Sequence, residues 1–256
     1  MKTPGRCVVL IAAAVVGGRA SAEETGHPLT AEVREKIAKD ASEVVTITMR
    51  ALSTDANDID ALSKRGDAHF VLAKFPEAVA DYESMVRIDP SLDPSHWRRG
   101  IAWFYAGEYE KAAKQFERYH SFDNVDRENG IWRYLCQVKQ SGVKEARQGL
   151  LQYEKDDREP FPDVFKLFAG TIQPDAIRER IESAKVAEDQ KEQRRFYADL
   201  YIGLNHAVEK RDAAAREALR RAVANAWASE ASYGPRWMWH VGRVHFEQLD
   251  AAAEKK

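Results

Sequence analysis

Three alanines, Ala78, Ala112 and Ala146, stand about 34 residues apart, each within a stretch of helix-like sequence. Other residues keep the same spacing: Arg65, Arg99 and Arg133; Gly66 and Gly100; Phe75, Tyr109 and Val143; Tyr82, Phe116 and Leu150. A fixed period of this length is typical of repeat architectures, whose units stack and bury a shared core. Such arrays usually present a binding surface, so the period favours a protein that holds a partner over one that converts a substrate.

The period predicts three helix-turn-helix repeats, over about residues 59–90, 93–124 and 127–155. Pro90 ends the first repeat, because proline cannot continue a helix without losing a hydrogen bond. Gly107 supplies the turn of the second repeat. The third repeat is the weakest, since Tyr134 stands where the first two have glycine.

The recurring small residues have a packing role. Paired helices approach to about 8–10 Å, at a distance set by the bulk of the side chains between them. We expect Gly66 and Gly100 on first helices, and Ala78 and Ala112 on second helices, to allow this close approach.

The sequence after residue 155 departs from the simple period. Charged residues and two prolines precede a predicted helical insert at 161–185, and residues 187–194 read as a loop or a solvated helix. A fourth hairpin is predicted at 195–225, since Gly203 and Ala215 repeat the spacing of Gly66 and Ala78. An amphipathic helix at 235–249 would cap the array, whose open end would otherwise expose apolar surface.

The first 22 residues have the pattern of a secretory signal peptide. A basic start precedes an apolar run, and Ala20-Ser21-Ala22 offers a cleavage site, which leaves 23–256 as the mature domain. We expect an exported protein, periplasmic or secreted, with an uncleaved N-terminal anchor as the alternative. Cleavage would leave Cys136 as the remaining cysteine, which we expect to be a buried apolar residue.

Motifs for chemistry are missing from the sequence. It has no H-E-x-x-H, C-x-x-C or G-x-S-x-G pattern and no glycine-rich phosphate loop. We therefore expect no enzyme, no metal and no cofactor. The net charge of −2 gives no reason to expect a nucleic-acid partner. The Asp156-Asp157 pair reads as solvated charge, and His69 and His96 as structural residues.

Residues 62–90 and 96–124 resemble the tetratricopeptide repeat family in their small residue, turn aromatic and alanine. The resemblance implies an all-α, right-handed superhelix of helical hairpins with a C-terminal capping helix. The second half is similar to the bacterial outer-membrane protein type called new lipoprotein I, through Arg195-Phe196-Tyr197 and residues 222–225. That similarity implies a scaffold for envelope proteases and cell-wall hydrolases. The chain lacks that family's lipid-acceptor cysteine after the signal run.

First helices of such hairpins line the concave side of the array. The residues there that are offset from the packing positions are candidates for binding a protein or peptide: Lys64, Phe70, Trp97, Arg98, Ile101, Phe104, Tyr105 and Trp132. Aromatic residues and arginine are enriched at binding hot spots. The leading hypothesis is a protein-binding scaffold, and a homodimer is an open alternative because hairpins can also stack between chains.

Two other functions stay open at this point. The aromatic residues could form a stacking platform for a small ligand or cell-wall fragment, and a deep closed pocket beside Trp97 would favour that function. A hydrolase assembled from distant residues is the third hypothesis, and buried, hydrogen-bonded histidine and carboxylate groups in a cleft would favour it.

Overall fold

The computed structural model describes residues 27–155 and 157–255, and every regular element in these ranges is a helix. The prediction of an all-α chain is confirmed for this part of the protein, whereas the predicted signal peptide at 1–22 lies outside it. The helices are α1 (Ala31–Thr54), α2 (Ile59–Val71), α3 (Phe75–Ile88), the short 3-10 helix η1 (Pro90–Leu92), α4 (Trp97–Tyr105), α5 (Tyr109–Phe122), α6 (Arg127–Ser141), α7 (Val143–Gln148), α8 (Phe161–Ala169), α9 (Pro174–Ser183), α10 (Glu188–Val208), α11 (Asp212–Ala224), α12 (Ala226–Glu230) and α13 (Tyr233–Ala253).

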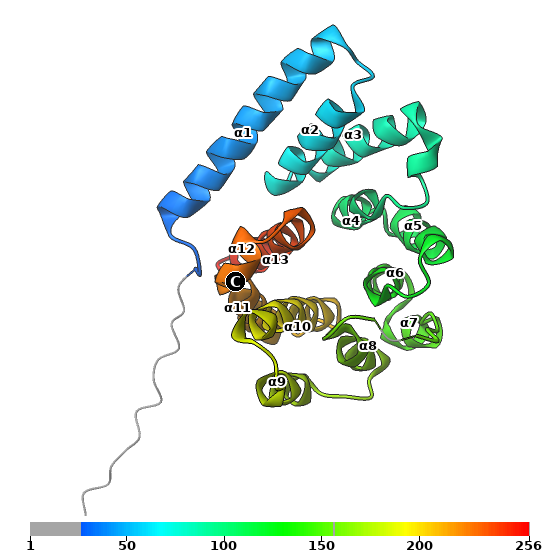
Figure 1. Cartoon of the computed structure of the whole chain (residues 1–256), viewed down its shortest axis with the longest axis vertical. Coiled ribbons are helices and arrows are strands. Elements are labelled where there is room, and N and C mark those ends of the chain that lie inside the picture. The colour runs from blue at the N-terminus through cyan, green and yellow to red at the C-terminus, as the bar shows by residue number, and fades with distance from the viewer. Residues whose placement is uncertain (1–26, 156, 256) are drawn as a thin grey trace, which may run out of the picture.

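Helices that are neighbours in the sequence pack on one another, most extensively α2 with α3, α5 with α6, and α10 with α11. From α2 to α11 they follow a curve, and α13 closes it by packing against α11 and reaching α2 (Figure 1). The C-terminal helix, expected at 235–249 as an end cap, therefore also covers the inner side of the curve.

The recurring arginines make equivalent contacts in successive helix pairs. Each donates to a group 16 residues later: Arg65 Nη2 to Asp81 at 2.6 Å, Arg99 Nε to Gln115 at 3.1 Å, and Arg133 Nη1 to the Gly149 carbonyl at 2.6 Å. The second helices α3, α5 and α7 also begin at equivalent positions, Phe75, Tyr109 and Val143. The 34-residue period thus corresponds to a repeated three-dimensional contact.

The glycines on first helices lie directly beneath a large side chain of the second helix. A Cβ at Gly66 would lie 2.6 Å from Tyr82 Cε1, and one at Gly203 would lie 2.5 Å from Leu219 Cγ. A Cβ at Gly100 would lie 2.7 Å from Phe116 Cζ. Since real Cβ atoms do not approach this closely, these positions require glycine for packing rather than for backbone freedom.

The third predicted repeat differs from the first two. Its second helix, α7, is short, and residues 149–155 follow it without regular structure. Tyr134, at the position of the earlier glycines, is fully buried and meets Phe168 of α8 edge to face, with ring centroids 5.3 Å apart. The bulky residue thus packs against the following α8.

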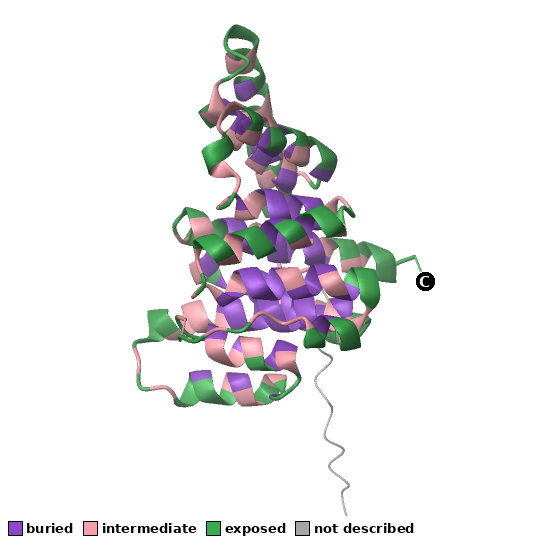
Figure 2. Cartoon of the chain, turned by 90° about the vertical axis from the view of Figure 1, so that its right-hand side faces the viewer, coloured by how far each residue is buried: buried purple, intermediate pink, exposed green. Residues whose placement is uncertain are grey.

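The second half of the chain places α10 and α13 beside the repeats. Residues 188–194 form the first turns of α10, so the solvated-helix alternative is the one observed. Buried residues gather in the middle of the molecule, and exposed ribbon is more common toward the end formed by the α1–α2 turn (Figure 2). Among the described residues, no helix is both long and apolar enough to cross a membrane.

Candidate functional site

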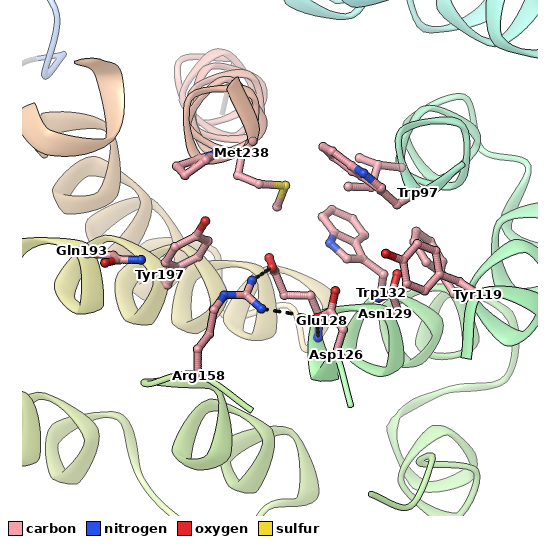
Figure 3. A pocket seen from close by; sticks show the side chains of 14 residues that line it. Trp97, Tyr119, Asp126, Glu128, Asn129, Trp132, Arg158, Gln193, Tyr197 and Met238 are labelled. Atoms are coloured by element: carbon pink, nitrogen blue, oxygen red, sulfur yellow. Dashed lines mark hydrogen bonds and ion pairs between the residues drawn. The ribbon is translucent and has the colours of Figure 1, made fainter. Parts of the chain in front are cut away.

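A cavity of about 350 Å³ lies between α4, α5, α6, α10 and α13. Its size is at the lower end of the range for small-molecule sites, about 300–1,000 Å³. Figure 3 shows side chains from these helices pointing toward one another around it. The lining residues are Trp97, Ile101, Phe116, Tyr119, Asp126, Glu128, Asn129, Trp132, Arg158, Gln193, Tyr197, Gly234, Pro235 and Met238.

Aromatic rings form most of the apolar wall of this cavity. Trp132 is buried and stacks on Phe116, with ring centroids 6.1 Å apart and an angle of 21° between the planes. Trp97 meets Trp237 of α13 edge to face at 4.9 Å. Met238, from the next position on α13, lies across the cavity from Trp132 (Figure 3). The apolar wall therefore depends on α13 being in place.

A carboxyl group lies on one side of the cavity. Glu128, in the first turn of α6, accepts a hydrogen bond from Tyr201 Oη at 2.5 Å on one oxygen and contacts Arg158 through the other. Burial raises the pKa of Glu128 to about 7, although the Arg158 guanidinium acts in the opposite direction. Near neutral pH this carboxyl is therefore divided between its protonated and ionised forms.

Arg158 is shared among several carboxylates. Its guanidinium contacts Glu128 and lies 3.8 Å from Asp126 (Figure 3), and it also lies 3.2 Å from Asp157. It also lies over the Phe161 ring, 4.3 Å from the centroid. Burial raises the pKa of Asp126 as well, against the effect of Arg158. The carboxyls of Asp126 and Glu128 therefore face the guanidinium of Arg158 within the cavity lining. Asp157, which is not a lining residue, also contacts that guanidinium.

A separate carboxylate, Asp67 of α2, fixes the start of α13. It accepts hydrogen bonds from Arg98 at 2.7 Å, from Tyr82 at 2.6 Å, and from Tyr233 and Trp237 of α13 at 2.6 and 3.1 Å. Groups from α3, α4 and α13 therefore meet at one side chain of α2. This contact holds Trp237 against Trp97, next to the cavity.

The structure divides the eight predicted binding residues among several environments. Trp97, Ile101 and Trp132 line the cavity, with Ile101 and Trp132 buried. Phe104 and Tyr105 lie at a different pocket, where Tyr105 Oη is 2.9 Å from His245 Nδ1 of α13.

The remaining three predicted residues lie closer to α2. Phe70 is buried and stacks on Trp237 with ring centroids 4.5 Å apart, while Arg98 is held by Asp67. Lys64 is exposed and pairs with Asp60 at 2.5 Å. The expectation that Phe70 and Phe104 face an open groove is wrong, because both side chains are buried.

Other predictions for individual residues have clear outcomes. Cys136 is buried, as expected. His96 caps α4 by accepting the Arg99 amide, and His69 lies 3.1 Å from Asp81, so both have structural contacts. The expectation that Asp157 is solvated is wrong. Only 7% of its side chain is exposed, and it accepts a hydrogen bond from the Arg127 amide at 3.0 Å. Asp156 lies outside the described residues.

The residues predicted from the sequence did not include Glu128, Arg158, Tyr197, Tyr201 or Met238. Glu128 carries one signal, an acidic residue in the first turn of a predicted helix, but this is also typical of an ordinary stabilised helix start. The other four come from segments far along the chain, and no spacing joins them.

A scan of the sequence against models of known protein families finds no match.

Proposed function

We propose that the chain is a non-catalytic binding protein that holds a compact ligand in the cavity beside Trp97. One observation carries the proposal: a cavity of about 350 Å³ combines aromatic walls with a few converging polar groups. This combination of apolar lining and sparse polar groups is typical of ligand sites. The cavity is bounded by side chains of five helices, which favours a compact ligand over an extended peptide.

We propose that the helices form a tetratricopeptide-type, right-handed superhelical array over about 59–155 and 195–225. The equivalent bonds of Arg65, Arg99 and Arg133 support this architecture, as do the close contacts beneath Gly66 and Gly100. In such an array the cavity would lie on the concave side, with α13 as an added wall.

A protein scaffold is the second candidate, and α1 supplies the observation in its favour. Val33, Ile47 and Met49 on this helix are 42%, 55% and 56% exposed. Large apolar side chains at the surface are common binding residues, although single ones are also normal. Photo-crosslinkers at Ile47 and, as the control, at exposed Ser141 test this candidate. A specific protein captured at Ile47 and absent at Ser141 supports it, and the same products at both positions contradict it.

Export to the periplasm or the medium belongs to the same proposal, based on the sequence pattern of residues 1–22. The mass of the protein purified from its native host tests it. A mature chain that begins at Glu23 supports cleavage, and a full-length chain in the membrane fraction supports the uncleaved anchor.

Hydrolysis is less well supported by the geometry. Among the described residues that line the cavity, none is a histidine, a serine or a cysteine. His69 and Asp81 are hydrogen-bonded, but they lie between α2 and α3 and not among the lining residues.

Blocking the cavity tests the proposed function directly. Gly234 lines it, and a Cβ at Gly234 would meet no atom within 4 Å, so a Cβ can be added there without a clash. Fragments with one aromatic ring are screened by tryptophan fluorescence against wild type, Gly234→Leu and the control Gly234→Ala. Binding to wild type and to Gly234→Ala, with loss in Gly234→Leu, supports the proposal. Equal binding to all three proteins contradicts it.

A further inference from the structure

The polar groups of the cavity carry more acid than base. Asp126 and Glu128 both line it, and Arg158 is the one cationic residue among the described lining side chains. Asp157, behind Arg158, contacts the same guanidinium at 3.2 Å. A ligand anion would meet the two lining carboxyls. The guanidinium of Arg158, which could pair with it, already contacts three acids.

The cavity walls favour positive charge for a separate reason. The faces of tryptophan and tyrosine rings carry partial negative charge and attract cations within about 6 Å of the ring centre. The cavity is lined by Trp97, Tyr119, Trp132 and Tyr197, from four different helices. The protein already shows this contact nearby, since the Arg158 guanidinium lies 5.7 Å from the Tyr197 ring centroid.

We propose that the ligand of this cavity is an organic cation, with a compact apolar body between the aromatic walls and an ammonium group directed at Glu128 and Asp126. This inference rests on the proposed function of the same cavity. Each Glu128 oxygen already takes one donor, from Tyr201 or Arg158. A carboxylate offers about four acceptor positions in all, which leaves room for an ammonium group.

Binding of the cation is coupled to the release of a proton from Glu128. The groups that face Glu128 are Asp126 at the N-cap of α6, Arg158 from the segment before α8, Tyr119 from α5, and Tyr197 and Tyr201 from α10, while Asp157 contacts the same Arg158 guanidinium. A cation in the cavity stabilises the ionised form of Glu128, so binding releases a proton below neutral pH. Affinity should therefore rise as the pH increases.

Three probes that share a phenethyl body test the charge preference by calorimetry. They are phenethyltrimethylammonium, whose charge does not titrate; its neutral isostere with carbon in place of nitrogen; and 3-phenylpropionate. At pH 8.5 we expect the cation to bind about tenfold more tightly than the isostere, and 3-phenylpropionate to bind most weakly. At pH 5.5 the affinity for the cation should fall about tenfold, which corresponds to loss of one charged partner.

A matched variant separates the role of Glu128 from general electrostatics. Glu128→Gln should remove the pH dependence of cation binding, whereas Glu77→Gln, at an exposed position on α3, should retain it. If the isostere or 3-phenylpropionate binds as tightly as the cation or more tightly, the charge assignment is overturned, while the proposed function of the cavity as a ligand site still stands. Failure of all three probes to bind at millimolar concentration would contradict both the assignment and the proposed function.

Discussion

Replacing Glu128 by glutamine should stabilise the protein in alkaline solution. The carboxyl has a pKa of about 7 in the folded chain against 4.5 in a peptide, so the folded state binds its proton more tightly than the unfolded state does. The contribution of this group to stability is therefore greatest below about pH 4.5. It declines as the pH rises to about 7 and is constant above that.

The size of the effect follows from the same pKa values. Each pH unit between 4.5 and about 7 costs about 1.4 kcal/mol, which gives about 3 kcal/mol in total. The side chain of Glu128 is only 15% exposed, so solvent screens little of this cost. The glutamine carbonyl can still accept from Tyr201, and Arg158 keeps Asp157 as its partner. Glu128→Gln should therefore be more stable than wild type by up to about 3 kcal/mol at pH 8 and nearly equal at pH 4.5.

Urea unfolding followed by helical circular dichroism at pH 4.5 and pH 8 measures the difference. Asp126 also has a raised pKa, but it is present in both proteins and cancels to first order. Glu77→Gln serves as the control for removal of one negative charge from the surface. The reasoning is refuted if Glu128→Gln is less stable than wild type at pH 8, or if the two proteins differ equally at both pH values.

Two further substitutions test the packing of the array. Gly66→Ala should lower the free energy of unfolding by about 1–3 kcal/mol, since the new Cβ would lie 2.6 Å from Tyr82 Cε1; thermal unfolding checks this, and a loss no greater than that of the open-site control Gly234→Ala would contradict it. Asp67→Asn should cost about 2–3 kcal/mol, because Arg98 would lose its charged partner while remaining largely buried. Urea unfolding measures this loss, and an unchanged midpoint would show that Asp67 does not hold α13 in place.

The repeated part of the fold could be predicted because it depends on contacts within each helix pair. Phe75, Tyr109 and Val143 recur in the sequence, and each begins a second helix. Gly66 and Gly100 likewise mark close contacts that need no knowledge of distant segments. The period did not reveal which residue each glycine or arginine contacts. That contact lies 16 residues later in each of these helix pairs, and the contacted residues also recur every 34 residues.

The position of α13 could not be predicted from local pattern. Apolar residues at 237, 238, 241 and 244 predict a helix with a buried face, but not the surface that covers it. The curvature that brings α13 from α11 to α2 accumulates over all the intervening helix pairs. This is why Phe70 and Phe104, expected on an open groove, are buried.

The polar part of the cavity is hidden in the sequence for a related reason. Glu128 and Arg158 are 30 residues apart and meet because the chain after α7 leaves the repeat pattern. Tyr201 lies a further helix pair away, 73 residues from Glu128. No periodic signal links these residues, so their association appears only once the helices are in place.

A crystal structure of the protein grown at pH 8.5 with phenethyltrimethylammonium tests the central claim most directly. We predict density for the probe inside the cavity, with its ring between Trp97 and Trp132 and its nitrogen nearest Glu128. Density for the probe only at the outer surface, or a cavity filled by its own side chains, would contradict the account.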